Sequence, residues 1–191
     1  MKISKRAICL MLVAMVCAMG CIPQWKTIEK PELTPKQANF KVTAPLGWVQ
    51  LDGLEKVTFI TKEGPGIQKI WIEQVHREKA FEALFKKKET KLEKDVLVTE
   101  LAEYYIADFK MISQGVQVTH KETLPALIDD KQGFKILMEY ANAEGLVFEV
   151  VTYGFLYEDH LYTLTFHAPR LFFYDRDLPV FEAMVDSFTL I

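Results

Sequence analysis

The feature that most limits what this chain can fold into is a run of four strand-like segments in its second half, separated by very short connections. The segments are residues 116–128, 133–142, 146–157 and 160–167. Turn-forming residues such as those at 142–145 fill the gaps, and their lengths are typical of β-hairpins. Connections this short join antiparallel neighbours, because a parallel return needs roughly a dozen residues or more. We therefore expect an antiparallel sheet.

Further elements surround this run. Strands are expected at 40–43, 57–61, 67–75 and 187–191, and helices at 78–94, 99–113 and 178–184. Strands that follow one another, with helices set apart from them, indicate an α+β protein. The predicted fold is a single antiparallel sheet of about six to seven strands that is flanked by helices.

The helix at 99–113 has the clearest pattern. Thr99 is placed to cap its N-terminus, and Gly115 follows its end. Its expected buried face consists of Leu101, Tyr105, Phe109 and Ile112. The same helical spacing at 78–94 brings Phe81, Leu84, Phe85 and Leu92 onto one stripe.

The N-terminus, residues 1–20, is built like an export signal. Lys2, Lys5 and Arg6 precede thirteen residues without a charge, from Ala7 to Met19. As a helix this run would span roughly 20 Å, which is too short for a bilayer core of about 30 Å. The pattern therefore indicates a cleaved signal peptide rather than a membrane span.

The residues that follow, Ala18-Met19-Gly20-Cys21, resemble the lipobox of bacterial lipoproteins. The resemblance implies lipidation of Cys21, which would become the first residue of the mature protein. Cys9 and Cys17 would leave with the signal, and acylation would then protect the last thiol from oxidation. Ordinary signal cleavage after Gly20, which would free a soluble protein, remains the alternative.

The mature chain is predicted to consist of a lipidated tether at 21–38, which contains three prolines, and a globular domain at 39–191. Cleavage removes only three charged residues, all basic, so the net charge changes from −3 to −6. This charge argues against nucleic-acid binding. We expect a monomer, held to a membrane of the bacterial cell envelope by the lipid on Cys21, with its domain outside the cytoplasm.

No pattern for catalysis, a metal or a cofactor is visible. His160 and His167 are seven residues apart on one predicted strand and therefore face opposite sides of the sheet. Ser187 lies outside any nucleophile elbow. Asp175 and Asp177 precede the last helix, where capping explains them better than calcium binding does.

Three adjacent aromatic residues, Phe172, Phe173 and Tyr174, precede the last helix. Core packing is the ordinary role of such residues. Three neighbours in sequence cannot all face inward, however, so at least one is expected to be exposed. An exposed ring here would be a candidate contact for a protein partner.

Segments at both ends of the predicted domain resemble the PsbP-like superfamily. These are 40–48, an opening strand followed by Pro and Trp; 162–169, the penultimate strand; and 181–188, the terminal helix and closing strand. The superfamily includes photosystem II extrinsic proteins, Mog-type Ran-binding proteins, and bacterial lipoproteins of the DcrB and LpqN kinds. The resemblance implies an antiparallel sheet with helices on both sides and a non-enzymatic docking or assembly role. It also makes Trp48 and Phe188 interior fold markers.

Docking onto an unidentified envelope protein is therefore the leading functional hypothesis. A carrier of small apolar ligands is the alternative, with a pocket lined by Trp71, Tyr140, Phe148 and Tyr153. A hydrolase ranks last. A cavity above about 300 Å³ would favour the carrier, whereas a filled core with an exposed apolar patch would favour docking.

Overall fold

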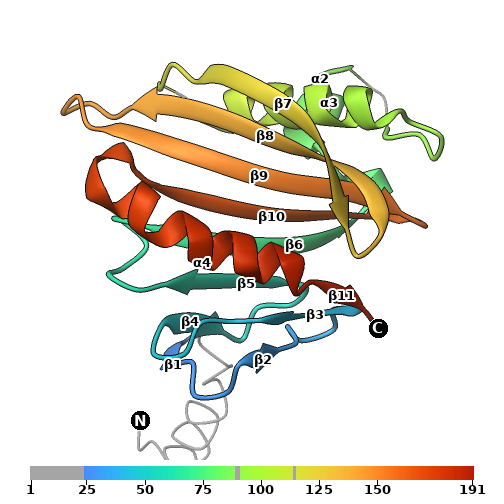
Figure 1. The fold of residues 1–191 in the computed structure, drawn as a ribbon. Coiled ribbons are helices and arrows are strands. Elements are labelled where there is room, and N and C mark those ends of the chain that lie inside the picture. The colour runs from blue at the N-terminus through green and yellow to red at the C-terminus, as the bar shows by residue number, and fades with distance from the viewer. Residues whose placement is uncertain (1–23, 89–90, 114) are drawn as a thin grey trace, which may run out of the picture.

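The computed structural model describes residues 24–88, 91–113 and 115–191, and its main feature is a large twisted sheet (Figure 1). The sheet has eight strands in the order β1-β4-β5-β6-β10-β9-β8-β7, and all neighbours are antiparallel. Its strands are β1 (Gln24–Thr27), β4 (Val49–Asp52), β5 (Val57–Thr61), β6 (Lys69–His76), β7 (Thr119–Ile128), β8 (Lys131–Ala141), β9 (Val147–Tyr157) and β10 (His160–Pro169). A smaller sheet has the order β11-β3-β2, formed by Thr189–Leu190, Phe40–Thr43 and Glu32–Leu33.

The predicted α+β class and the antiparallel sheet are confirmed, but the strand count of six to seven is wrong. Two strands that the sequence pattern did not indicate, β1 and β4, extend the large sheet at one edge. The predicted opening and closing strands, β3 and β11, pair with each other in the smaller sheet instead. The four-strand run in the second half forms β7 to β10 as a continuous meander.

The turn between β7 and β8 is tighter than the sequence suggested. Asp129 and Asp130 both have positive φ, at 47° and 58°. This is the backbone of a two-residue type I′ turn, which Asp tolerates better than most residues. The Asp129 carboxylate also accepts a hydrogen bond from the Leu190 N–H at 3.1 Å, which joins the turn to the C-terminal strand.

Helices cover both faces of the large sheet. The helices α2 (Glu82–Lys88) and α3 (Val98–Ile112) lie on one face, and α4 (Asp175–Asp186) lies on the other (Figure 1). The helix expected at 78–94 is therefore shorter than predicted, and a 3-10 turn at Arg77–Lys79 precedes it. The N-terminus of α3 is also not capped by Thr99: the Glu100 carboxylate accepts a hydrogen bond from the Leu97 N–H at 3.1 Å.

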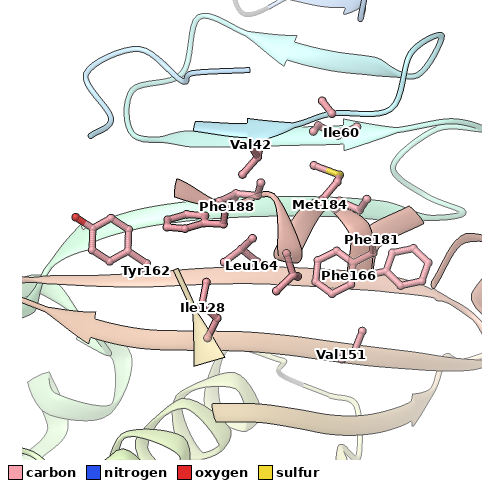
Figure 2. Close-up of a cluster of buried hydrophobic side chains, with 14 of the residues drawn as sticks. Val42, Ile60, Ile128, Val151, Tyr162, Leu164, Phe166, Phe181, Met184 and Phe188 are labelled. Atoms are coloured by element: carbon pink, nitrogen blue, oxygen red, sulfur yellow. The ribbon is translucent and has the colours of Figure 1, made fainter. Parts of the chain in front are cut away.

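The larger core lies between α4, the small sheet and the large sheet (Figure 2). Along β10, Tyr162, Leu164 and Phe166 point into this core, because alternate residues of a strand face the same side. The ring of Phe166 stacks on Phe181 of α4, with 5.7 Å between centroids. Trp48 and Phe188 are buried, as predicted for interior markers of the fold.

Residues 24–38 correct the prediction of a tether at 21–38. In the structure β1 pairs with β4, and β2 pairs with β3. Ile28 is buried, and its N–H donates to the Trp48 carbonyl at 2.7 Å. The prolines do not prevent this pairing. Pro31 has no N–H to donate, but it takes part here only through its carbonyl, which accepts a hydrogen bond from the Ala44 N–H at 2.6 Å. The segment is part of the folded domain.

Candidate functional site

The predicted partner contact forms a turn between β10 and α4, and its residues differ sharply in exposure. We call Leu171–Tyr174 the aromatic turn. Leu171 is 76% exposed and Phe172 is 66% exposed. Phe173 is half-buried, and Tyr174 is buried and stacks on Phe166, with 5.6 Å between ring centroids. One ring of the three is therefore exposed, while the last anchors the turn in the core.

The backbone holds Phe172 outward at an energetic cost. Its φ is 71° and its ψ is −53°, a conformation that side-chain-bearing residues rarely adopt. Such strain costs on the order of 1–3 kcal/mol and persists only where the surroundings impose it. Strained residues of this kind cluster at ligand clamps and other functional sites, so the strain marks the turn as a candidate contact.

Arg176 provides the support beneath the turn. Its guanidinium lies 5.1 Å from the ring centroids of both Phe172 and Phe173. It forms ion pairs with Glu63 at 2.8 Å and with Asp177, and the hydrogen bonds that its guanidinium donates to these carboxylates raise the pKa of Arg176. The guanidinium therefore stays charged, and its cation–π contacts hold the rings of Phe172 and Phe173 in place.

Asp177 has a different role from the predicted one. It is 2% exposed and makes no capping hydrogen bond at the start of α4. Its carboxylate instead accepts from Arg176 Nε at 2.8 Å and from Gln68 Nε2 at 3.3 Å. Its ion pair is with the adjacent Arg176, but its hydrogen bond with Gln68 joins residues far apart in the chain, which sequence spacing alone does not reveal.

A second candidate site, which the sequence did not indicate, is a cleft of about 570 Å³ on the opposite face of the sheet. We call it the sheet–helix cleft. Strands β6 and β10 supply one side and helices α2 and α3 the other. Most of its lining is apolar or aromatic, and Trp71, Phe81 and Phe109 contribute rings. Ile112, predicted to be buried, is 61% exposed and lies on the lining.

Two carboxylates from different elements line this cleft, Glu73 on β6 and Asp108 on α3. Burial raises the pKa of Glu73, and the nearby Asp108 carboxylate raises it further. Burial also raises the pKa of Asp108, although the Leu84 N–H donates a hydrogen bond to it at 2.9 Å. The Glu73 carboxylate makes no hydrogen bond or ion pair with another residue that the structure describes. The negative charges of the Glu73 and Asp108 carboxylates are therefore only partly compensated by hydrogen bonds.

Sequence reasoning missed both carboxylates because they are far apart in the chain and meet only through the packing of α3 on the sheet. One signal was available for Glu73. The buried residues Ile70 and Ile72 fix the face of β6 that points to the larger core, so Trp71 and Glu73 must line the other face. An acid between apolar residues on a central strand indicates a special environment.

The pocket that the sequence suggested does not form as a unit. Trp71 lines the sheet–helix cleft, whereas Tyr140 and Phe148 stack with each other and with His167. Tyr153 faces the other side of the sheet, where its ring packs near Phe181 at 6.0 Å. Alternation along the strands places Tyr153 on the opposite face of the sheet from the other three residues.

His160 and His167 lie on opposite sides of β10, as their spacing predicted. His160 packs against His76 near the β9–β10 turn, while His167 faces the opposite side of β10. Burial, with a contribution from Lys69, lowers the pKa of His167 to about 3. Among residues 24–88, 91–113 and 115–191, no group of three or more His, Cys, Asp or Glu side chains is placed to hold a metal.

The predicted lipidation site, Cys21, and the signal segment before it lie outside the described residues. Within the part of the chain that the structure describes, none of the helices has the length and apolar character needed to cross a membrane.

Comparisons with known proteins identify the fold. No protein-family model matches the sequence, and a search of curated proteins finds no match. Cyanobacterial PsbP from Synechocystis sp. PCC 6803 has a similar solution structure, with a TM-score of 0.60 at 11% identity over 91% of this chain and 96% of that one. The Saccharomyces cerevisiae Ran-binding protein Mog1p is similar with a TM-score of 0.55 at 10% identity, over 88% and 96% of the two chains. The chain therefore has a PsbP/Mog-like fold.

Proposed function

We propose that this protein is a non-catalytic lipoprotein of the bacterial cell envelope that docks onto a protein partner through the aromatic turn. The observation that carries the proposal is the exposure of Leu171 and Phe172, with Phe172 held in a strained left-handed conformation. Aromatic anchors that fill pockets of a partner contribute much of the binding energy of protein interfaces, and adjacent exposed apolar side chains mark candidate interaction sites. The name of the similar Mog1p structure is consistent with a protein-binding role for this fold.

A glycine at position 172 separates binding from folding. Glycine adopts positive φ without strain, so Phe172→Gly should leave the melting temperature unchanged or raise it, since it removes an exposed ring and relieves the backbone. Partner binding should fall sharply in the same variant. The matched control is Leu127→Gly on edge strand β7, where the side chain is 71% exposed and distant in sequence from the turn.

Co-purification from envelope extracts, with the full-length wild type and both variants as bait, measures partner binding. The proposal requires one envelope protein that accompanies the wild type and Leu127→Gly but is lost with Phe172→Gly. A partner that is retained equally by all three proteins would refute docking through the turn.

A small-ligand carrier is the second candidate, and the sheet–helix cleft favours it. Its volume of about 570 Å³ lies within the range of about 300–1,000 Å³ that is typical of ligand pockets. The cleft lies on the α2–α3 face, whereas the aromatic turn leads into α4 on the other face. Occupation of one site therefore leaves the other open.

A further inference from the structure

We infer that the sheet–helix cleft binds an organic cation, namely an ammonium group attached to an apolar body. The inference rests on the carrier candidate and adds the chemical class of the ligand. The two parts of such a ligand correspond to two parts of the cleft: the carboxylates of Glu73 and Asp108, and the rings and aliphatic side chains around them.

The balance of charge in the cleft favours a cation. Its charged lining residues are Glu73, Lys79, Glu82 and Asp108, three acids and one base. Glu73 and Asp108 line the same cleft, and the Asp108 carboxylate raises the pKa of Glu73, so the two negative charges repel each other. Neither carboxylate forms an ion pair with a lysine or arginine that the structure describes. A ligand ammonium would remove the repulsion and supply the missing counter-charge.

The cleft suits an organic cation better than a bare metal ion, because much of its lining is apolar. Calcium takes six to eight oxygen ligands, and magnesium usually keeps several waters. Trp71, Phe81 and Phe109 offer no oxygen ligands, and among the described residues no three acidic or histidine side chains come together to hold a metal. The aromatic faces instead suit an ammonium group and its hydrocarbon, through cation–π attraction and burial of apolar area.

Trp71 provides an internal example of this chemistry. The Lys69 ammonium lies 5.3 Å from the centroid of the Trp71 ring, in a more open hollow of about 440 Å³ that shares Trp71, Glu73 and Ile112 with the cleft. A cation is therefore already held against this indole by the protein's own chain. A ligand ammonium deeper in the cleft would meet the same ring system and, in addition, both carboxylates.

Three probes of similar size and different charge test the inference: phenethylamine, 2-phenylethanol and 3-phenylpropionate. Calorimetric titration of the purified full-length protein should show binding of phenethylamine about tenfold or more tighter than that of 2-phenylethanol, because hydrogen bonds between charged groups are stronger than those to a neutral hydroxyl. The carboxylate probe should bind weakest of the three.

Variants at the carboxylates assign the effect to the cleft. Glu73→Gln and Asp108→Asn should each weaken phenethylamine about tenfold or more, while the affinity for 2-phenylethanol stays the same. The control is Glu103→Gln on an exposed position of α3, which should change nothing. Melting curves of each variant show whether it is folded before titration.

The outcomes separate the inference from the carrier candidate on which it rests. If 2-phenylethanol binds as tightly as phenethylamine and the amide variants bind both normally, the cleft is a carrier site for neutral ligands and the cation inference is wrong. If none of the three probes binds, both the cation inference and the carrier candidate are overturned.

Discussion

Trp48 and Phe188 are large aromatic residues in the core, and each should be essential for stability. Phe188 stacks on Phe40 at 5.1 Å and meets Phe155 edge-on at 5.6 Å, while Trp48 is 5% exposed. Truncation of a buried aromatic residue to alanine costs about 3–5 kcal/mol. Trp48→Ala and Phe188→Ala should therefore each lower the free energy of unfolding by that amount in urea titrations. Exposed Phe172→Ala serves as the control, and a Trp48→Ala protein that unfolds at the wild-type midpoint would contradict the assignment.

His167 should make the protein sensitive to acid. Burial lowers its pKa from 6.5 to about 3, so the folded state keeps the ring neutral where the unfolded chain takes up a proton. The contribution of His167 to the free energy of unfolding is fully present above pH 6.5. It is lost as the pH falls toward about 3, by up to about 1.4 kcal/mol per pH unit.

The variant His167→Gln isolates this effect, because an amide can still bond to the Tyr140 hydroxyl, which pairs with His167 in the wild type. The difference in unfolding free energy between wild type and variant should change with pH in this window and level off above it. Parallel curves for the two proteins would mean that His167 titrates normally.

Single residues show where sequence reasoning succeeds and where it fails. Trp48 and Phe188 could be predicted as interior because each lies in a strong local pattern. The pairing of Glu73 with Asp108 could not be predicted, since it depends on how α3 is placed across the sheet. The sequence predicted that at least one ring among residues 172–174 is exposed, but not which one. In the structure Tyr174 is buried and Phe172 is exposed.

At the level of elements, the β8–β9 pair is packed so closely that its glycines, Gly133 and Gly154, have no room for a side chain. A Cβ at Gly154 would meet the ring of Phe134, a residue that is 1% exposed and cannot move aside easily. Gly154→Ala should therefore cost about 1–3 kcal/mol of unfolding free energy, as overpacking does. Gly66→Ala is the matched control, because a Cβ there meets nothing within 4 Å and should be neutral or slightly stabilising. Equal denaturation midpoints for the two variants would disprove the close contact.

The elements themselves were predictable where connections are short. The run from β7 to β10 follows from hairpin-length turns, which leave few alternatives to antiparallel pairing. The strands β1 and β2 were missed because the prolines beside them suggested a free linker, while the strands that pair with them lie further along the chain. A short strand gains its stability from its partner, and the partner is invisible in the local pattern.

At the scale of the whole molecule, attachment to a membrane should depend on one atom, the sulfur of Cys21. The resemblance of residues 1–21 to a signal peptide with a lipobox predicts lipidation there, and acyl chains contribute about 0.8 kcal/mol per buried CH₂. Cys21→Ala should therefore move the protein from washed membranes to the soluble fraction. A variant that stays with the membranes, or a wild type without acyl mass in its mass spectrum, would exclude the lipid anchor.

The central claim is that the aromatic turn is the docking surface, and photo-crosslinking in intact cells tests it most directly. A photoreactive phenylalanine analogue is placed at position 172 or, as a control, at position 127 on β7, where the native side chain is equally exposed to solvent. If the aromatic turn is the docking surface, position 172 should give one dominant protein adduct that is absent from position 127. No adduct at 172, or the same adducts at both positions, would contradict it.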